Sequence, residues 1–235
     1  MTEQPVLTEK QGKELWIRFN RPDDQNRIDR NSMEILTESL DRIDEDPEIA
    51  VVIITGSDEY FCSGGRVDTA STELEKARYG RAITHLHEKL AQVRPPVIAV
   101  VSGHCRAGGM AILAATDVAI AADDVNFGFP EITHGGFPVM AMASTMPLLP
   151  PKIAFDLYYS GRDMTAQEAH QLGLVSSIVP RGSLETTVKE YIETITSRPP
   201  EVMALGRRAF YGMEPMSAES RLKYGKEILQ SVLRK

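Results

Sequence analysis

Runs of apolar residues predict four buried strands in the first half of the chain. Two of the runs are continuous and rich in β-branched residues, which is typical of strands covered on both faces of a sheet. Shorter runs of the same kind lie before and after them. The predicted strands are Leu15–Asn20, Ala50–Gly56, Val97–Gly103 and Val118–Ala122.

Helical periodicity occupies the segments around these strands. Apolar residues recur every three or four positions in Asn31–Asp44 and in Leu74–Val93, which predicts two amphipathic helices. The segment Gly108–Thr116 is apolar on every side and predicts a buried helix. Because strands alternate with helices, we expect an α/β core with parallel strand pairs and right-handed crossovers.

The last third of the chain has a mainly helical pattern. Thr165 and Glu168 have the spacing of a capping box, which predicts the start of a short helix. Ser176–Pro180 predicts one more short strand. From Leu184 onward the pattern is helical and is interrupted by prolines, so we expect a small helical appendage after the core.

The composition is that of an ordinary globular protein. With 235 residues, we expect one domain plus an appendage. A net charge of -7 argues against a nucleic-acid partner. Cys62 and Cys105 form neither a CxxC pair nor a zinc spacing, so we expect free thiols in a reducing compartment. The sequence has no leader-like apolar segment and no run of membrane-spanning length, so we expect a cytoplasmic protein without a membrane partner.

Two glycine-rich turns each follow a predicted strand. The first ends the segment VVIITGSDEYFCSGG, Val51–Gly65, and the second lies in GHCRAGG, Gly103–Gly109. Two such turns can aim two backbone N–H groups at one point. Glu131 follows the next strand and supplies a carboxylate that can move a proton there. These are the groups needed to form and quench an enolate.

The chain resembles the enoyl-CoA hydratase/isomerase (crotonase) superfamily over nearly its whole length. The resemblance is carried, in the family's order, by NRPDDQN, FCSGG, GHCRAGG, FGFPEITHGGFP and SGRDMTAQEAHQLGLVSSIVP. It implies an α/β fold, a crotonase-like spiral of ββα units with a helical C-terminal appendage. It also implies a core over residues 1–180, a trimerising helical region over 181–235, and a homotrimer or hexamer.

The resemblance also implies which residues carry the chemistry. The backbone N–H groups of Gly65 and Gly108 match the family's oxyanion hole, where each donor stabilises the anionic thioester oxygen by roughly 2.7–4 kcal/mol. Glu131 matches the catalytic acid/base, and Ser63 and Gly64 are expected to contact the substrate. That substrate is an acyl-CoA thioester, so coenzyme A enters as part of it. No separate cofactor and no metal are expected.

Ala111 departs from the hydratase pattern. Hydratases of the family carry a second glutamate at this position, whereas alanine leaves Glu131 as one proton shuttle. That arrangement resembles enoyl-CoA isomerases, which carry a proton between C2 and C4, so we expect an isomerase with Ala111 at its substrate pocket. The alternatives are a hydratase, in which His134 or Asp68 would hold the water, another enolate reaction (decarboxylation, thioester hydrolysis, C–C cleavage or formation), and a non-catalytic RNA-binding relative.

Five further positions have two interpretations each. Arg66 stands where many relatives have aspartate and either contacts a ligand carboxylate or phosphate or lies on the surface. His134 either faces the pocket or is a satisfied polar residue. Cys62 is expected to be a small buried side chain rather than a nucleophile, because no His/Asn partner is apparent. Arg207 and Arg208 are expected on a solvated helix face rather than at CoA phosphates.

Overall fold

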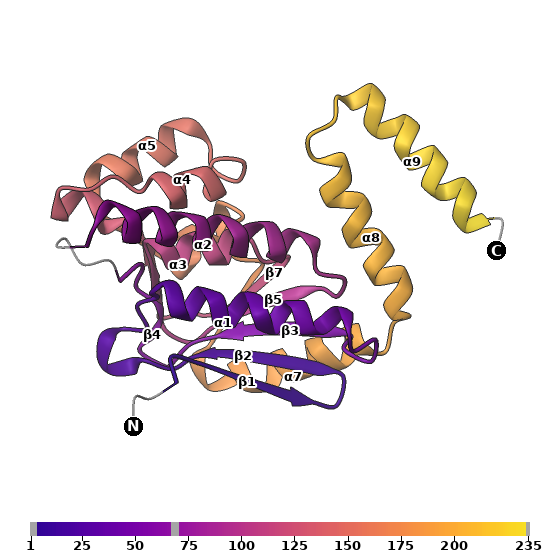
Figure 1. The fold of residues 1–235 in the computed structure, drawn as a ribbon, viewed down its shortest axis with the longest axis horizontal. Helices are drawn as coiled ribbons and strands as arrows, with labels where there is room; N and C mark the ends of the chain where they lie inside the picture. Colours follow the sequence, from indigo (N-terminus) through magenta and orange to yellow (C-terminus); the bar gives the residue numbers. More distant parts are fainter. Residues whose placement is uncertain (1–3, 67–70, 234–235) are drawn as a thin grey trace.

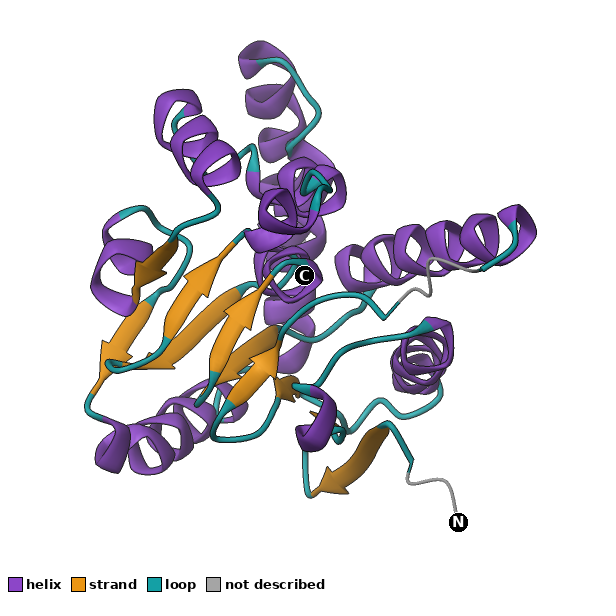
Figure 2. Ribbon diagram, turned by 90° about the vertical axis from the view of Figure 1, so that its left-hand side faces the viewer, coloured by secondary structure: helices purple, strands orange, loops and turns teal. Residues whose placement is uncertain are grey.

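A computed structural model describes residues 4–66 and 71–233 of the chain. Two sheets form its centre and helices surround them (Figures 1 and 2). The larger sheet has six strands in the order β1-β2-β3-β5-β7-β10, and the smaller has four in the order β4-β6-β8-β9. All neighbouring strands run parallel except the pairs β1–β2 and β8–β9.

The strands of the larger sheet are β1 (Val6–Gln11), β2 (Glu14–Phe19), β3 (Val51–Thr55), β5 (Val97–Val101), β7 (Val118–Ala122) and β10 (Ser177–Val179). Those of the smaller sheet are β4 (Tyr60–Cys62), β6 (His104–Arg106), β8 (Asn126–Gly128) and β9 (Asp163–Thr165).

The α-helices are α1 (Arg30–Asp41), α2 (Glu73–Gln92), α3 (Gly108–Ala114), α4 (Val139–Thr145), α5 (Pro151–Ser160), α6 (Ala166–Gln171), α7 (Leu184–Thr196), α8 (Pro200–Met213) and α9 (Ala218–Leu233). Short 3-10 helices span Pro22–Asp24, Arg42–Asp44, Pro130–His134 and Arg181–Ser183.

The predicted spiral of ββα units is confirmed. Three times in succession the chain gives one strand to the larger sheet and the next to the smaller: β3 then β4, β5 then β6, and β7 then β8. After the first two of these pairs it forms α2 and α3. The repeat stacks β4, β6 and β8 side by side, so the loops that follow them meet at one edge.

The central strands are buried as their composition predicts. Every residue of β3 and of β5 is buried, because helices or the second sheet cover both faces. The predicted strands and helices in this part agree with the structure to within a few residues at their ends. Thr165 caps α6 as expected by accepting a hydrogen bond from the Glu168 N–H at 3.2 Å. The Glu168 carboxylate binds Arg162 instead of completing the box.

The smaller sheet, the edge strand β1 and the helices α4 and α5 were not predicted. Each strand of the smaller sheet has only three residues, which is too short for an alternation of apolar and polar positions to be recognised. In β1 only Val6 is buried, so its pattern is that of a polar segment. These strands are stabilised by pairing with other strands rather than by a local sequence pattern.

The prediction that Arg207 lies on a solvated helix face is wrong. Its side chain is buried, and its Nε donates to the Asp117 carboxylate at 2.7 Å. It also donates to the carbonyls of Leu90, Ala91 and Val93, which end α2 without intrahelical partners. A cation at the end of a helix is favoured by the helix dipole. Arg208 alone of the pair is exposed.

The C-terminal helices fall into two groups. Helix α7 packs on the core through Leu184, Val188, Ile192 and Ile195, all buried. Helices α8 and α9 form an arm that projects from the core (Figure 1). No helix in the described part of the chain is both long and apolar enough to cross a membrane.

Candidate active site

The two glycine turns touch each other. The first follows β4 and contains Ser63–Gly65, and the second follows β6 and leads into α3 at Gly108. A β-carbon added to Gly64 would lie 2.7 Å from the Ala107 β-carbon and 3.3 Å from the Gly108 nitrogen. Gly64 also has a φ of +117°, which an L side chain rarely adopts. Glycine at 64 therefore permits both the turn and its close approach to the second turn.

The backbone N–H groups of Gly65 and Gly108 are free to bind a ligand. The carbonyl of Gly65 accepts two hydrogen bonds from Arg27, at 3.1 and 3.3 Å, and that of Gly64 accepts one from the Ile28 N–H. Neither glycine N–H donates a hydrogen bond to another described residue. Gly108 is the first residue of α3, where an N–H has no partner within the helix. Hydrogen bonds to the carbonyls therefore hold the first turn in place, while the N–H groups of Gly65 and Gly108 remain available to a ligand.

Glu131 supplies an unpaired carboxylate near these donors. It lies in the 3-10 helix that follows β8, and its Oε2 is buried without a hydrogen-bond partner among the described residues. Burial raises the pKa of Glu131 above its ordinary value, because the charged form loses solvation. A raised pKa makes a carboxyl group better suited both to give and to take a proton during a reaction.

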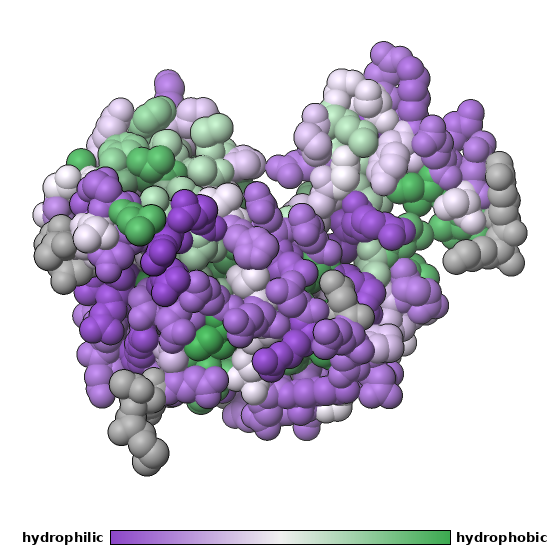
Figure 3. Space-filling model, viewed as in Figure 1, coloured by the Kyte–Doolittle hydropathy of each residue, from purple (hydrophilic) through white to green (hydrophobic). Residues whose placement is uncertain are grey.

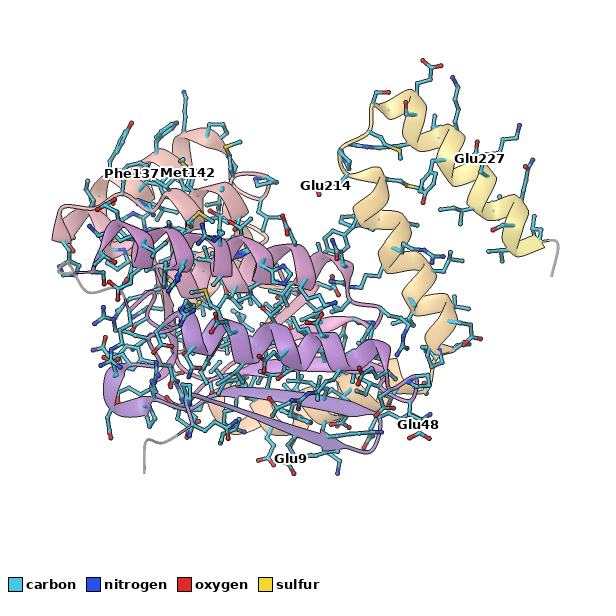
Figure 4. All side chains as sticks on the ribbon, viewed as in Figure 1. Glu9, Glu48, Phe137, Met142, Glu214 and Glu227 are labelled. Atoms are coloured by element: carbon cyan, nitrogen blue, oxygen red, sulfur yellow. The ribbon has the colours of Figure 1, made fainter. Side chains whose placement is uncertain are left out.

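One cleft of about 1090 Å³ joins these groups. Gly65, Gly108 and Glu131 all line it, so the three residues predicted to carry the chemistry share one cavity. Phe137, Val139 and Met140 form an exposed apolar wall next to Glu131. Figure 4 shows Phe137 beside α4 and α5, and Figure 3 shows apolar residues gathered over the same segment.

The other predicted site residues divide into two groups. Ser63 and His134 line the cleft, the latter with an exposed side chain. Gly64, Arg66 and Ala111 are not among the residues that line it. Asp68 lies outside the described residues.

Arg66 and Ala111 each have other neighbours. The Arg66 side chain is exposed, and its Nε lies 3.4 Å from the Asp24 carboxylate. Ala111 is fully buried in α3, and its carbonyl lies 3.2 Å from Nε2 of His87 on α2. The sequence places Ala111 at the substrate pocket, whereas in the structure it is fully buried and is not among the residues that line the cleft.

Cys62 is buried, as predicted, and does not face the cleft. Desolvation raises the pKa of its thiol to about 12, so the nucleophilic thiolate is strongly disfavoured. Cys105 is its partner in the register between β4 and β6, and both cysteines are free thiols. No group of His, Cys, Asp and Glu in the described part of the chain could hold a metal ion.

Several polar side chains at the cleft were not predicted, among them two arginines and a tyrosine. Arg27 and Tyr79 flank Gly65, and Arg106 is held in a two-bond ion pair with Asp163, at 3.1 and 2.5 Å. Tyr79 stands four residues before Ile83, which also lines the cleft. Residues with this spacing lie on the same face of a helix, and this is the only signal in the sequence that could have indicated Tyr79. The sequence carries no comparable signal for the two arginines.

Curated relatives resemble the chain over almost all of its length. An enoyl-CoA hydratase of Mycobacterium tuberculosis is 30% identical over 229 residues, which are 95% of this chain and 86% of the relative. The (E)-benzylidenesuccinyl-CoA hydratase of Thauera aromatica is 31% identical over 98% of this chain and 91% of its own. Both names describe hydratases.

Solved structures have the same fold. That of an enoyl-CoA hydratase from Bacillus anthracis superposes with a TM-score of 0.91 at 28% identity and covers 99% of this chain and 92% of the other. The structure of human enoyl coenzyme A hydratase domain-containing protein 3 superposes with a TM-score of 0.94 at 22% identity. It covers 98% of this chain and 92% of the human chain. The family model for enoyl-CoA hydratase/isomerase matches residues 9–233. This chain therefore belongs to the enoyl-CoA hydratase/isomerase (crotonase) family of acyl-CoA enzymes.

Proposed function

We propose that this cleft stabilises the enolate of an acyl-CoA thioester and that Glu131 moves the proton. The observation that carries the proposal is the buried, unpaired Oε2 of Glu131 in the same cleft as two unused N–H donors. The N–H groups of Gly65 and Gly108 bind the thioester oxygen as it becomes anionic. Phe137, Val139 and Met140 accept the acyl chain.

Hydration of a 2-enoyl-CoA is the reaction that the relatives support first. The curated relatives named above are hydratases, which favours this alternative over the isomerase expected from Ala111. In this reaction Glu131 takes a proton from water, the hydroxide adds to C3, and the enolate forms at the thioester. Glu131 then gives the proton to C2. The hydroxyl group on C3 and the new hydrogen on C2 together make up the added water, so one carboxylate is sufficient for the reaction.

Isomerisation of a 3-enoyl-CoA is the second candidate, and the carboxylates of the cleft favour it. Among the described residues that line the cleft, only Glu131 and Asp163 carry carboxylates, and Asp163 is held by Arg106. Glu131 is therefore the one available shuttle. It would take a proton from C2, which leaves a dienolate at the thioester, and deliver that proton to C4 without adding water.

A substrate panel separates the two reactions. The protein is incubated with 2-enoyl- and 3-enoyl-CoA thioesters, and products are followed by mass and by absorbance of the conjugated thioester. Hydration adds the mass of one water to a 2-enoyl-CoA and removes its absorbance. Isomerisation leaves the mass of a 3-enoyl-CoA unchanged and creates that absorbance.

The same panel tests the assignment of Glu131. Glu131→Gln should lower turnover by roughly 10²–10⁴-fold while acyl-CoA binding persists. Glu9→Gln, on the exposed edge strand β1, is the matched control and should keep full activity (Figure 4). Near-normal turnover by Glu131→Gln would contradict the proposal for either reaction.

We further propose that the protein is a cytoplasmic homotrimer or hexamer in which residues 181–235 contribute to assembly. Phe210, Leu222 and Leu233 on the projecting arm are 70%, 78% and 76% exposed, which supports burial against another copy. Light scattering on the full chain tests this, and a mass of one chain would contradict it.

A further inference from the structure

Tyr79 is placed against the first oxyanion glycine. It lies on α2, and its hydroxyl oxygen occupies the space that a β-carbon on residue 65 would fill. Its ring carbon Cζ is 3.1 Å from the same point. Gly65 thus leaves room for the phenol at the floor of the cleft, and Tyr79 is one of the residues that line this cleft.

The Tyr79 hydroxyl is not used by the protein itself. The side chain is partly buried against the core, and its hydroxyl makes no hydrogen bond to any other described residue. A partly buried phenol usually finds a hydrogen-bond partner for its hydroxyl. An open cleft beside the hydroxyl offers a place for a ligand to supply that partner.

The hydroxyl lies close to the residue that supplies the first donor. The β-carbon position of residue 65 and its amide nitrogen are both attached to the same α-carbon. Because the Tyr79 hydroxyl sits at that β-carbon position, it lies near the Gly65 N–H, and both residues line the same cleft.

The hydroxyl keeps its proton under working conditions. Burial raises the pKa of Tyr79 to about 12, while Arg27 nearby lowers it by a smaller amount. The group is therefore a hydrogen-bond donor throughout the neutral range. A neutral donor beside a developing negative charge stabilises that charge without moving a proton.

We propose that the Tyr79 hydroxyl is a third hydrogen-bond donor to the thioester oxygen, beside the N–H groups of Gly65 and Gly108. This inference rests on the proposed enolate chemistry. The third donor acts on hydration and on isomerisation alike, because both pass through the same oxyanion. It makes Tyr79 a catalytic residue, since the hydroxyl contacts the reacting thioester.

The first test measures polarisation of a bound thioester without turnover. In a Glu131→Gln background, cinnamoyl-CoA is added and its absorbance maximum is recorded free and bound. Hydrogen bonds to the thioester oxygen pull electron density along the conjugated system and shift the maximum to longer wavelength. Adding Tyr79→Phe should make this shift smaller, whereas adding Tyr191→Phe, on α7 away from the cleft, should leave it unchanged.

The second test separates transition-state stabilisation from binding. In the otherwise unchanged enzyme, Tyr79→Phe should lower kcat by about 10²-fold with little change in KM, because the donor acts on charge that develops in the reaction. Tyr191→Phe should keep the kcat of the wild type.

The outcomes distinguish this inference from the function on which it rests. A red shift of equal size with and without the Tyr79→Phe substitution would overturn the third donor and leave the two-donor site intact. The same holds for a Tyr79→Phe enzyme with full kcat. If cinnamoyl-CoA shows no shift at all with Tyr79 in place, the proposed enolate site is contradicted, and the third donor with it.

Discussion

The Tyr79 hydroxyl fills the space that a β-carbon on Gly65 would need, so the two residues are coupled. Gly65→Ala should therefore displace the phenol and distort the turn, lowering kcat/KM by about 10-fold or more. In a Tyr79→Phe background the same substitution should cost less, because the clashing oxygen is gone. Steady-state kinetics of the wild type, both single variants and the double variant measure this coupling.

Gly80 provides the matched control for that cycle. It lies next to Tyr79 on α2, and an added β-carbon would meet nothing within 4 Å. Gly80→Ala should keep full activity and raise the free energy of unfolding by about 0.5–1 kcal/mol, because alanine loses less entropy in a helix. Strictly additive effects of Gly65→Ala and Tyr79→Phe would show that the two residues do not interact.

Glu131 should make the stability of the protein depend on pH. Burial raises its pKa in the folded state, so the folded protein binds this proton more tightly than the unfolded chain does. Its contribution to stability is complete below the ordinary pKa of glutamate and is lost as the pH rises through the raised value. Glu131→Gln cannot ionise and should gain stability relative to the wild type across that window.

Urea denaturation of both proteins from acidic to neutral pH checks this expectation. The difference in unfolding free energy should be smallest in acid and should level off once Glu131 is ionised in the folded wild type. The exposed Glu9→Gln variant serves as control and should follow the wild type at every pH. A constant difference between Glu131→Gln and the wild type would mean that the Glu131 carboxylate is not destabilised by burial.

Groups that lie within one contiguous segment can be predicted from the sequence, whereas contacts between residues far apart in the sequence cannot. Gly65, Gly108 and Glu131 each follow a short strand of the smaller sheet. The sequence motifs that contain these residues could be recognised in order, although the short strands before them could not be predicted. The contact of Tyr79 with Gly65 depends on how α2 packs, which no local pattern records. Ala111 also contacts this helix, since its carbonyl lies 3.2 Å from Nε2 of His87.

Arg207 shows the same limit for a charged residue. Its helical segment predicts only that one face is polar, whereas its actual partners are Asp117, at a separation of 90 residues, and the end of α2. The sequence does not distinguish an arginine that caps the end of a distant helix from an arginine exposed to solvent. Burial can be recognised only when the partner that neutralises the charge is known.

The two cysteines should be unreactive in the native protein. Both are fully buried, and burial raises the thiol pKa to about 12 for Cys62 and well above its ordinary value for Cys105. Ellman's reagent should modify neither thiol before unfolding and both thiols in denaturant, because only the exposed thiolate reacts. Rapid modification of either cysteine in the folded protein would contradict this burial.

Breaking the Arg207–Asp117 pair should weaken the attachment of the C-terminal arm. Arg207→Met keeps much of the side-chain length but leaves Asp117 without its cation and the carbonyls at the end of α2 without donors. Removing one partner of a fully buried ion pair costs about 3–5 kcal/mol, and here only Arg207 is buried while Asp117 is exposed to solvent. Asp117 also keeps hydrogen bonds from the Val97 N–H and the Tyr211 hydroxyl, so the loss should be smaller than this range and the melting temperature should fall by a few degrees.

Arg208→Met is the matched control for the arm, since Arg208 is the exposed neighbour of Arg207 on the same helix. It makes the same chemical change without disturbing that pair and should unfold like the wild type. Limited proteolysis adds a local readout, because an arm released by Arg207→Met should be cut within α8 or α9 before the core is degraded. Equal melting temperatures and equal cleavage patterns for the two variants would show that the Arg207–Asp117 pair does not hold the arm to the core.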